Sequence, residues 1–290
     1  MTEFVQLLVK GLAFGSAYGL VALGFVVVFK ATGVVNFAQG SFLLAGAYLT
    51  FTATVRWGLP FPVGVALAGV GAVALALVVE RAVVRRLTGE PPVTVLLATL
   101  GVAIVLEQVV TLAWGFRPHH IGDPWGAASV RWAGVALSQV DLATLAVAGA
   151  AFAGLALFFR RTRLGLALRA SAADHEAAAA HGIAPALVSR SAWALAAGAA
   201  TVAGVLLASG PAAATPDLGD AALRAFPAVI LGGFVSLGGA LAGGLTVGVV
   251  EVMTAGYLPG NELVVPYLVM LAVLLLRPQG LFVAREARRL

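Results

Sequence analysis

Two carboxylates stand inside long apolar runs of this sequence: Glu107, with Gln108 beside it, and Glu251. A charge at the centre of a membrane helix costs about 2.5–3.5 kcal/mol, so each carboxylate is expected to face protein or water. Three kinds of chemistry are open to them. They could line a solute pathway, couple an ion in a carrier, or form a hydrogen bond between helices with the carboxyl protonated.

Glycine interrupts two apolar stretches, residues 33–40, which hold Asn36 and Gln39, and residues 232–239, which hold Ser236. Interrupted hydrophobic segments in matching places of two halves point to a translocation site. The free N–H groups of a helix that starts there can bind a carboxylate. Plain turns between helices are the alternative. The candidate pathway residues are Asn36, Gln39, Ser41, Glu107, Gly232, Gly233 and Ser236.

Motifs for catalysis are missing from the sequence. All four histidines (119, 120, 175 and 181) fall in predicted loops, and neither HExxH nor GxSxG occurs. There is no GxxxxGK[ST] motif, so ATP energy must come from a partner, and no cysteine for a disulfide or thiolate site. We therefore expect no enzyme activity, no cofactor and no bound metal.

The segment 160–189 is basic at its start and then rich in alanine. The alanine run predicts a helix, which Gly182 and Pro185 end. Leu164 and Leu168 share one face of it at four-residue spacing. A helix with so few long side chains can lie close in a groove of another protein, and a solvated connector is the alternative.

Membrane-spanning elements must position these residues. Of the 290 residues, 61% are hydrophobic and 11% charged, whereas an ordinary soluble domain is about 25% charged. Spans of about 20 apolar residues can accommodate such a composition in lipid. The predicted spans are 7–29, 37–55, 61–79, 93–113, 140–159, 187–209, 221–234, 237–257 and 263–276. The sequence thus predicts an all-α integral membrane protein, a polytopic bundle of nine transmembrane helices (eight is the alternative) forming one domain over residues 1–290.

Basic residues cluster after alternate predicted spans. Thirteen of the 18 Lys and Arg residues are Lys30, Arg81, Arg85, Arg86, Arg160, Arg161, Arg163, Arg169, Arg190, Arg277, Arg285, Arg288 and Arg289. Nine spans put all of these on the cytoplasmic side, with the N-terminus and the loop 114–139 outside and the loop 160–189 inside. This membrane pattern, rather than a nucleic-acid surface, explains the formal net charge of +5.

Small and aromatic residues add two further expectations. Gly11, Gly15 and Gly19 follow one another at four-residue spacing, as do two later pairs, 239 with 243 and 244 with 248. Such spacing lets helix backbones approach closely in lipid. The tryptophans of the external loop 114–139 predict a cap at the membrane interface.

Several segments resemble known bacterial permeases. The stretch GSAYGLVALGFVVVFKATGVVNFAQGSFLLAGAY of residues 15–48 resembles branched-chain amino acid permeases of the LivH type, as do AVILGGFVSLGGALAGG at 228–244 and RPQGLF at 277–282. Gln39 stands where this family usually has histidine and Ser41 where it has glutamate, departures that bear on the substrate. Gly165, Arg169-Ala170, Asp174, Ala177-Ala178 and Gly182-Ile183 resemble the cytoplasmic coupling motif of ABC importer permeases.

The resemblance implies an ABC importer permease fold with partly inverted repeats, in the bacterial cytoplasmic (inner) membrane. It implies four kinds of partner besides lipid and no nucleic acid: a second related permease subunit, two cytoplasmic ATPase subunits, and a periplasmic or extracellular substrate-binding protein. The residues implied to couple to the ATPases are Gly165, Arg169, Ala170, Asp174, Ala177, Ala178 and Gly182.

We interpret the sequence as the permease subunit of an ATP-driven ABC importer for branched-chain or other hydrophobic amino acids. A permease for urea or short amides is one alternative. An ion-coupled secondary amino-acid carrier, with Glu107 or Glu251 as the coupling acid, is the other. The coupling motif favours the importer, because a carrier has no ATPase to bind.

Overall fold

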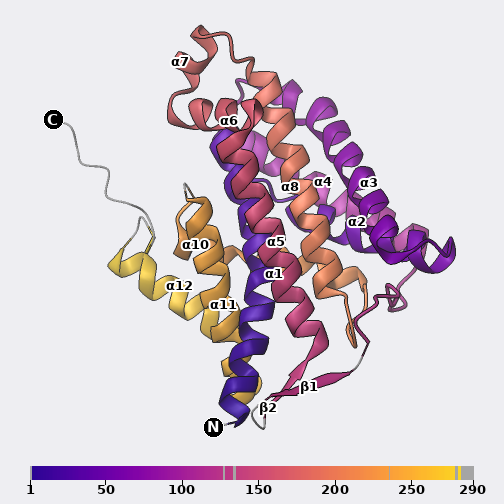
Figure 1. Cartoon of the computed structure of the whole chain (residues 1–290). Helices are drawn as coiled ribbons and strands as arrows, with labels where there is room; N and C mark the ends of the chain where they lie inside the picture. The colour runs from indigo at the N-terminus through magenta and orange to yellow at the C-terminus, as the bar shows by residue number, and fades with distance from the viewer. Residues whose placement is uncertain (1, 127, 133–134, 235, 278–279, 282–290) are drawn as a thin grey trace.

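The computed structural model describes residues 2–126, 128–132, 135–234, 236–277 and 280–281 as a bundle of α-helices with one small hairpin (Figure 1). Six of the described helices are long and apolar enough to span a membrane. They are α1 (Thr2–Thr32), α3 (Phe61–Ala82), α4 (Pro92–Trp114), α5 (Gln139–Arg161), α8 (Pro185–Leu207) and α11 (Leu237–Tyr257).

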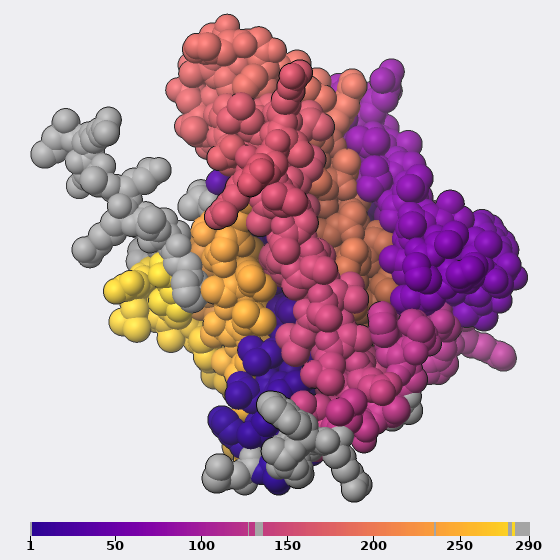
Figure 2. All heavy atoms as spheres, in the orientation of Figure 1, coloured from indigo at the N-terminus to yellow at the C-terminus, as the bar shows by residue number. Residues whose placement is uncertain are grey.

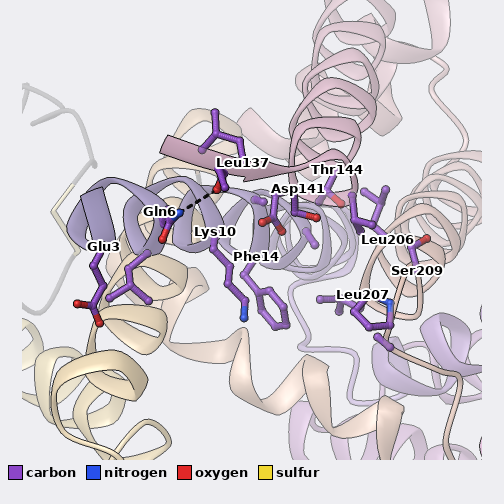
Figure 3. Close-up of a pocket in the computed structure, with 18 residues that line it drawn as sticks. Glu3, Gln6, Lys10, Phe14, Leu137, Asp141, Thr144, Leu206, Leu207 and Ser209 are labelled. Carbon is purple, nitrogen blue, oxygen red and sulfur yellow. Dashed lines mark hydrogen bonds between the residues drawn. The ribbon is translucent and has the colours of Figure 1, made fainter. Parts of the chain in front are cut away.

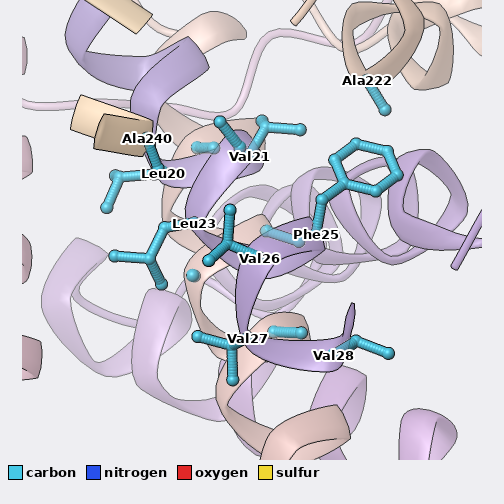
Figure 4. Close-up of a cluster of buried hydrophobic side chains, with 14 of the residues drawn as sticks. Leu20, Val21, Leu23, Phe25, Val26, Val27, Val28, Ala222 and Ala240 are labelled. Carbon is cyan, nitrogen blue, oxygen red and sulfur yellow. The ribbon is translucent and has the colours of Figure 1, made fainter. Parts of the chain in front are cut away.

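Helix α1 forms the axis of the bundle. In its most apolar 18-residue window 83% of the residues are buried, whereas the corresponding share in α4 and in α5 is 17%. Figure 4 shows its side chains from Leu20 to Val28 in a cluster that Ala222 and Ala240 complete from other helices. Such a helix is apolar all round because protein surrounds it.

Glycines bring α1 and α11 into backbone contact. A Cβ placed on Gly15 would lie 2.7 Å from the carbonyl oxygen of Gly244, and one on Gly11 would lie 2.8 Å from the Cα of Val249. Gly248 meets the backbone of Gly15 in the same way. The predicted close packing of glycine stripes is therefore confirmed, and the two helices run antiparallel.

Two passages through the bundle are made of shorter pieces. The first is α2 (Gln39–Phe51), which continues as a π turn, Thr52–Arg56. The second begins with a 3-10 turn, Pro216–Asp220, followed by α9 (Ala221–Arg224) and α10 (Phe226–Gly232). Both therefore contain helix ends inside the bundle, where backbone N–H and C=O groups lack helical partners.

The two ends of the bundle differ in structure. At one end, which we call the hairpin end, strands β1 (Ser129–Trp132) and β2 (Val135–Ser138) pair antiparallel near the start of α1. At the opposite end, which we call the lobe end, α6 (Arg163–Ala173) and α7 (His175–Ala180) form a lobe at the top of Figure 2. Helix α6 packs on α5, α8 and α1, and α7 follows it at the outer end of the lobe.

Apolar side chains cover much of the outside of the bundle. Val70 on α3 is 67% exposed, Leu112 on α4 is 86% exposed, and Leu275 on α12 (Val264–Leu276) is 78% exposed. Surfaces of this kind are stable against lipid or another membrane subunit. The chain is accordingly a multi-pass membrane protein.

The helices agree with six of the nine predicted spans. The other three fall on shorter elements: 37–55 on α2 and its π turn, 221–234 on α9 and α10, and 263–276 on α12. The count of nine crossings stays a prediction. The hairpin within 114–139 was not predicted from the sequence, because its four-residue strands carry too short a pattern to detect.

Candidate functional site

The first broken passage buries the polar residues that the sequence singled out. The side-chain oxygen of Asn36 accepts a hydrogen bond from the N–H of Ala38 at 3.0 Å, which turns the chain into α2. Gln39 is fully buried, and its Nε2 donates to the carbonyl oxygen of Ala196 on α8 at 3.2 Å. It packs on Gly24 of α1, where a Cβ would collide with the glutamine amide. Glycine at position 24 thus makes room for Gln39.

Three buried polar atoms around this break have no hydrogen-bond partner in the described part of the chain: Nδ2 of Asn36, Oε1 of Gln39 and Nε1 of Trp193. Buried polar atoms are usually satisfied, so exceptions call for an explanation. Two donors and one acceptor here are available to water or to a polar solute. The bundle therefore contains a polar spot where α2 begins.

Phenylalanine rings connect the two broken passages. Phe37, just before α2, stacks on Phe226 at the start of α10, with ring centroids 6.2 Å apart. Phe234 lies 6.0 Å from Phe226 and 4.9 Å from Phe29 of α1. These rings, which were not singled out from the sequence, connect the interrupted segments 33–40 and 232–239 through Phe226.

Ser41 and Glu107 lie on the α2–α4 side of this region. The Ser41 hydroxyl donates to the carbonyl oxygen of Ala103 at 3.1 Å. Glu107 is one turn further along α4 and is partly buried. The structure therefore groups Asn36, Gln39 and Ser41, with Glu107 at their edge.

Gly232, Gly233 and Ser236 shape the turn between α10 and α11. Gly232 packs directly on the backbone of Gly239, and Gly233 has φ +76°. The Ser236 hydroxyl accepts a hydrogen bond from the N–H of Gly239 at 2.9 Å and caps α11. These contacts explain the residue types without a solute, so the geometry gives them a structural role.

A second polar cluster, only partly predicted from the sequence, joins α1 to α9 and α11. Tyr18 of α1 donates a hydrogen bond to Glu251 of α11 at 3.1 Å, and both side chains are buried. Arg224, at the end of α9, is close enough to interact electrostatically with both. Glu251 was predicted to need a polar partner. The arginine inside the predicted span 221–234 was the available signal for the rest.

The predicted coupling helix is two helices. Asp174 leaves the helical conformation, with φ −157° and ψ 110°, and its carboxylate accepts a hydrogen bond from the N–H of Ala177 at 2.9 Å. Asp174 is thus the N-cap of α7. Aspartate is favoured at N-caps and disfavoured inside helices. The expectation of one continuous helix was wrong, whereas its predicted end is confirmed, because Gly182 follows α7 with φ +85°.

The seven predicted coupling residues divide by exposure. Gly165 is buried at the elbow between α5 and α6, where a Cβ would lie 2.6 Å from the Cα of Phe159. Ala178 is buried against its own chain. Arg169, Ala177 and Gly182 are exposed, along with Asp174, and Ala170 is partly buried. The lobe therefore presents Arg169 and Ala177 outward, while Gly165 and Ala178 hold its shape.

A model of one family, described as "Branched-chain amino acid transport system / permease component", matches residues 7–274. The branched-chain permease protein LivH of Escherichia coli (strain K12) is 30% identical over 300 residues, with 99% of this chain and 97% of the relative covered. BraD of Pseudomonas aeruginosa is 31% identical over 304 residues, with 99% and 98% covered. A probable LivH of the archaeon Methanocaldococcus jannaschii is 28% identical over 283 residues, with 90% and 87% covered.

One solved structure is similar in fold. It is PsaBC from Streptococcus pneumoniae in complex with Fab, with a TM-score of 0.51 and 13% identity, covering 93% of this chain and 91% of that chain. At this identity the similarity concerns the fold alone.

Proposed function

Because the chain belongs to the family of branched-chain amino acid transport permease components, we propose that it imports branched-chain or other hydrophobic amino acids. It is a permease subunit of an ABC importer and a multi-pass inner-membrane protein. The substrate class is supported by the relatives in two bacteria, whose names specify branched-chain amino acid transport.

The proposed transporter has partners at both ends of the bundle. Two ATPase subunits bind at the lobe end, which faces the cytoplasm, and a substrate-binding protein delivers the amino acid at the hairpin end. A second, related permease completes the membrane part and covers some of the exposed apolar surface of the outer helices. ATP hydrolysis takes place in the partners, since this chain carries no P-loop.

The lobe transmits the movement of the ATPases into the bundle. Two contacts support this step: Gly165 packs α6 on the end of α5, and His175 of α7 contacts the carbonyl oxygen of Ala31 in α1 at 2.8 Å. Since α1 packs against α8, α11 and α10, a shift of the lobe reaches both broken passages. The polar atoms of Asn36 and Gln39 then contact the solute as the passages rearrange.

The observation that carries this proposal is the exposed small face of α7, on the lobe at the end of the bundle (Figure 2). Ala177→Glu tests it sharply. Residue 177 is the third position of α7 after its N-cap, where glutamate favours a helix, so α7 itself should remain folded. A charge buried unpaired in an interface is costly, and we expect ATP-driven uptake and ATPase co-purification to be lost.

The matched control is Ala128→Glu, an exposed alanine near the hairpin, which should be mild. Ala178→Glu is less informative, because residue 178 is buried inside the lobe. Normal uptake by Ala177→Glu with its ATPases bound would contradict the coupling mechanism. Uptake that persists without ATP and follows an ion gradient would instead identify a secondary carrier.

A further inference from the structure

A cavity of about 600 Å³ opens at the hairpin end, between α1, α5 and the end of α8 (Figure 3). None of its lining residues belongs to α2, α6, α7, α9 or α10, so it is separate from the broken passages and the lobe. Gln6 of α1 donates a hydrogen bond to the carbonyl oxygen of Ala136 in β2 at 3.1 Å, which fixes one wall to the hairpin. Small-molecule sites commonly have volumes of about 300–1,000 Å³.

The lining changes from polar to apolar along α1. Glu3, Gln6 and Lys10, with Leu7 among them, line the part near the start of α1, and Ala13, Phe14 and Ala17 line the part further along the helix. At about 1.5 Å per residue, Lys10 and Ala17 are about 10 Å apart along the helix. The cavity thus suits a short solute with a charged end and an apolar end.

Two opposite charges line this cavity, close enough to interact electrostatically but not joined in a salt bridge. Lys10 comes from α1, and Asp141 comes from the first turn of α5. They form no salt bridge with each other, since Arg85 with Glu80 is the one salt bridge among the described residues. Lys10 is exposed and Asp141 is partly exposed, so a solute can reach both charges.

We propose that this cavity binds the free zwitterionic amino acid, as an entry site on the permease itself. The Lys10 ammonium binds the α-carboxylate, the Asp141 carboxylate binds the α-ammonium group, and the branched side chain lies against Phe14 and Leu206. This inference rests on the proposed substrate class. It also separates amino acids from urea and short amides, which carry neither charge.

A phospholipid with an ammonium and a phosphate in its headgroup presents similar charges. The lining favours the amino acid for two reasons. The apolar part that α1 contributes ends at Ala17, and the buried hydroxyl of Thr144 belongs to the lining, where it suits a small polar solute better than an acyl chain.

Saturation-transfer NMR on the whole transporter in nanodiscs, without its binding protein, tests the site with leucine as the probe. Lys10→Gln and Asp141→Asn should each weaken leucine binding roughly tenfold, as expected for one lost charge-assisted contact. Lys10→Arg should retain binding, because it retains the charge. Arg117→Gln, an exposed residue outside the cavity, is the matched control and should change nothing.

Two leucine analogues test which charged group of leucine each side chain binds. 4-Methylpentanoate lacks the ammonium group and should bind more weakly than leucine. Lys10→Gln should weaken its binding further, whereas Asp141→Asn should leave it unchanged. Leucinamide lacks the carboxylate and should show the reverse. Leucine binding that both variants leave intact would overturn the proposal, as would native mass spectrometry that finds a phospholipid lost on Lys10→Gln in place of leucine.

ATP-driven leucine uptake by the unaltered transporter, supplied with its binding protein, is measured in parallel. This measurement distinguishes failure of the entry site from failure of the proposed import function. Uptake with no response of leucine binding to the cavity variants rejects the entry site alone. A charge-dependent leucine site in a transporter that takes up no amino acid supports the cavity and rejects the importer.

Discussion

The imidazole Nε2 of His175, at the start of α7, lies 2.8 Å from the carbonyl oxygen of Ala31 in the last turn of α1. The last four carbonyls of a helix have no helical donor, so this contact satisfies one of them. It also joins the projecting lobe to the most buried helix of the bundle. A side chain outside the membrane is thereby in direct contact with the central helix.

Replacing His175 by alanine should uncouple the lobe from α1. We expect ATPase binding to persist and uptake to fall several-fold, because the lost hydrogen bond is worth only about 1 kcal/mol to the fold but transmits movement. His181→Ala is the matched control, since His181 is exposed and bonds only to Ala177 of its own helix at 2.8 Å. Equal uptake by the two variants would show that the lobe acts by another route. The measurement is ATP hydrolysis and uptake in proteoliposomes.

The orientation can be tested with single cysteines, because the chain contains none. Ala128→Cys near the hairpin should react with an impermeant maleimide in intact cells. Ala179→Cys in α7 should react only after permeabilisation, and both positions are exposed. Ser171, on the same lobe, is only 3% exposed and would be a poor probe. Labelling of residue 179 in intact cells would invert the proposed topology.

Gly15→Ala should destabilise the bundle. Its Cβ would lie 2.7 Å from the carbonyl oxygen of Gly244 and 2.8 Å from the Cα of Leu245, so α1 and α11 would have to move apart. Overpacking of this kind costs about 1–3 kcal/mol. Gly101→Ala on α4 is the control, since nothing lies near its Cβ and alanine favours a helix by about 1 kcal/mol. Thermal unfolding in detergent should separate the two variants.

Arg85 neutralises a buried carboxylate. Glu80 is 1% exposed and bonds to the Arg85 guanidinium at 2.5 Å, while the arginine side chain is 28% exposed. Arg85→Ala would leave that charge unpaired and should cost about 1–3 kcal/mol, at the low side for a buried pair because water reaches the arginine. The double variant Glu80→Gln with Arg85→Ala should recover much of the loss. Arg86→Ala, at an exposed neighbour, should have little effect on the unfolding temperature.

The features that the sequence could predict are those with local or periodic signals. The spacing of Gly11, Gly15 and Gly19 predicted a close helix contact, and the structure shows that the partner is α11. Asp174 was equally readable as an N-cap, since its bond to Ala177 spans three residues, and only the alanine run around it concealed the break.

Contacts between residues far apart in the sequence could not be predicted from local patterns. The stacking of Phe37 on Phe226 joins positions 189 residues apart, and no local pattern marks either ring. Nothing in the sequence pairs Arg224, near the start of the predicted span 221–234, with a partner, whereas the structure places it beside Tyr18 and Glu251. Which polar residue faces which depends on the packing of all the helices, and that packing has no signature within one window of sequence.

The contact between α1 and α11 has a consequence for biogenesis. Residues 33–236, 204 in number, separate the two helices, so ribosomes adding roughly 5–20 residues per second need about 10–40 s to supply the second after the first. During that interval the glycine face of α1 lies in the membrane without its main partner. We expect a cysteine at residue 15 to crosslink to insertion machinery in chains arrested before residue 237, and to lose that crosslink once α11 has emerged.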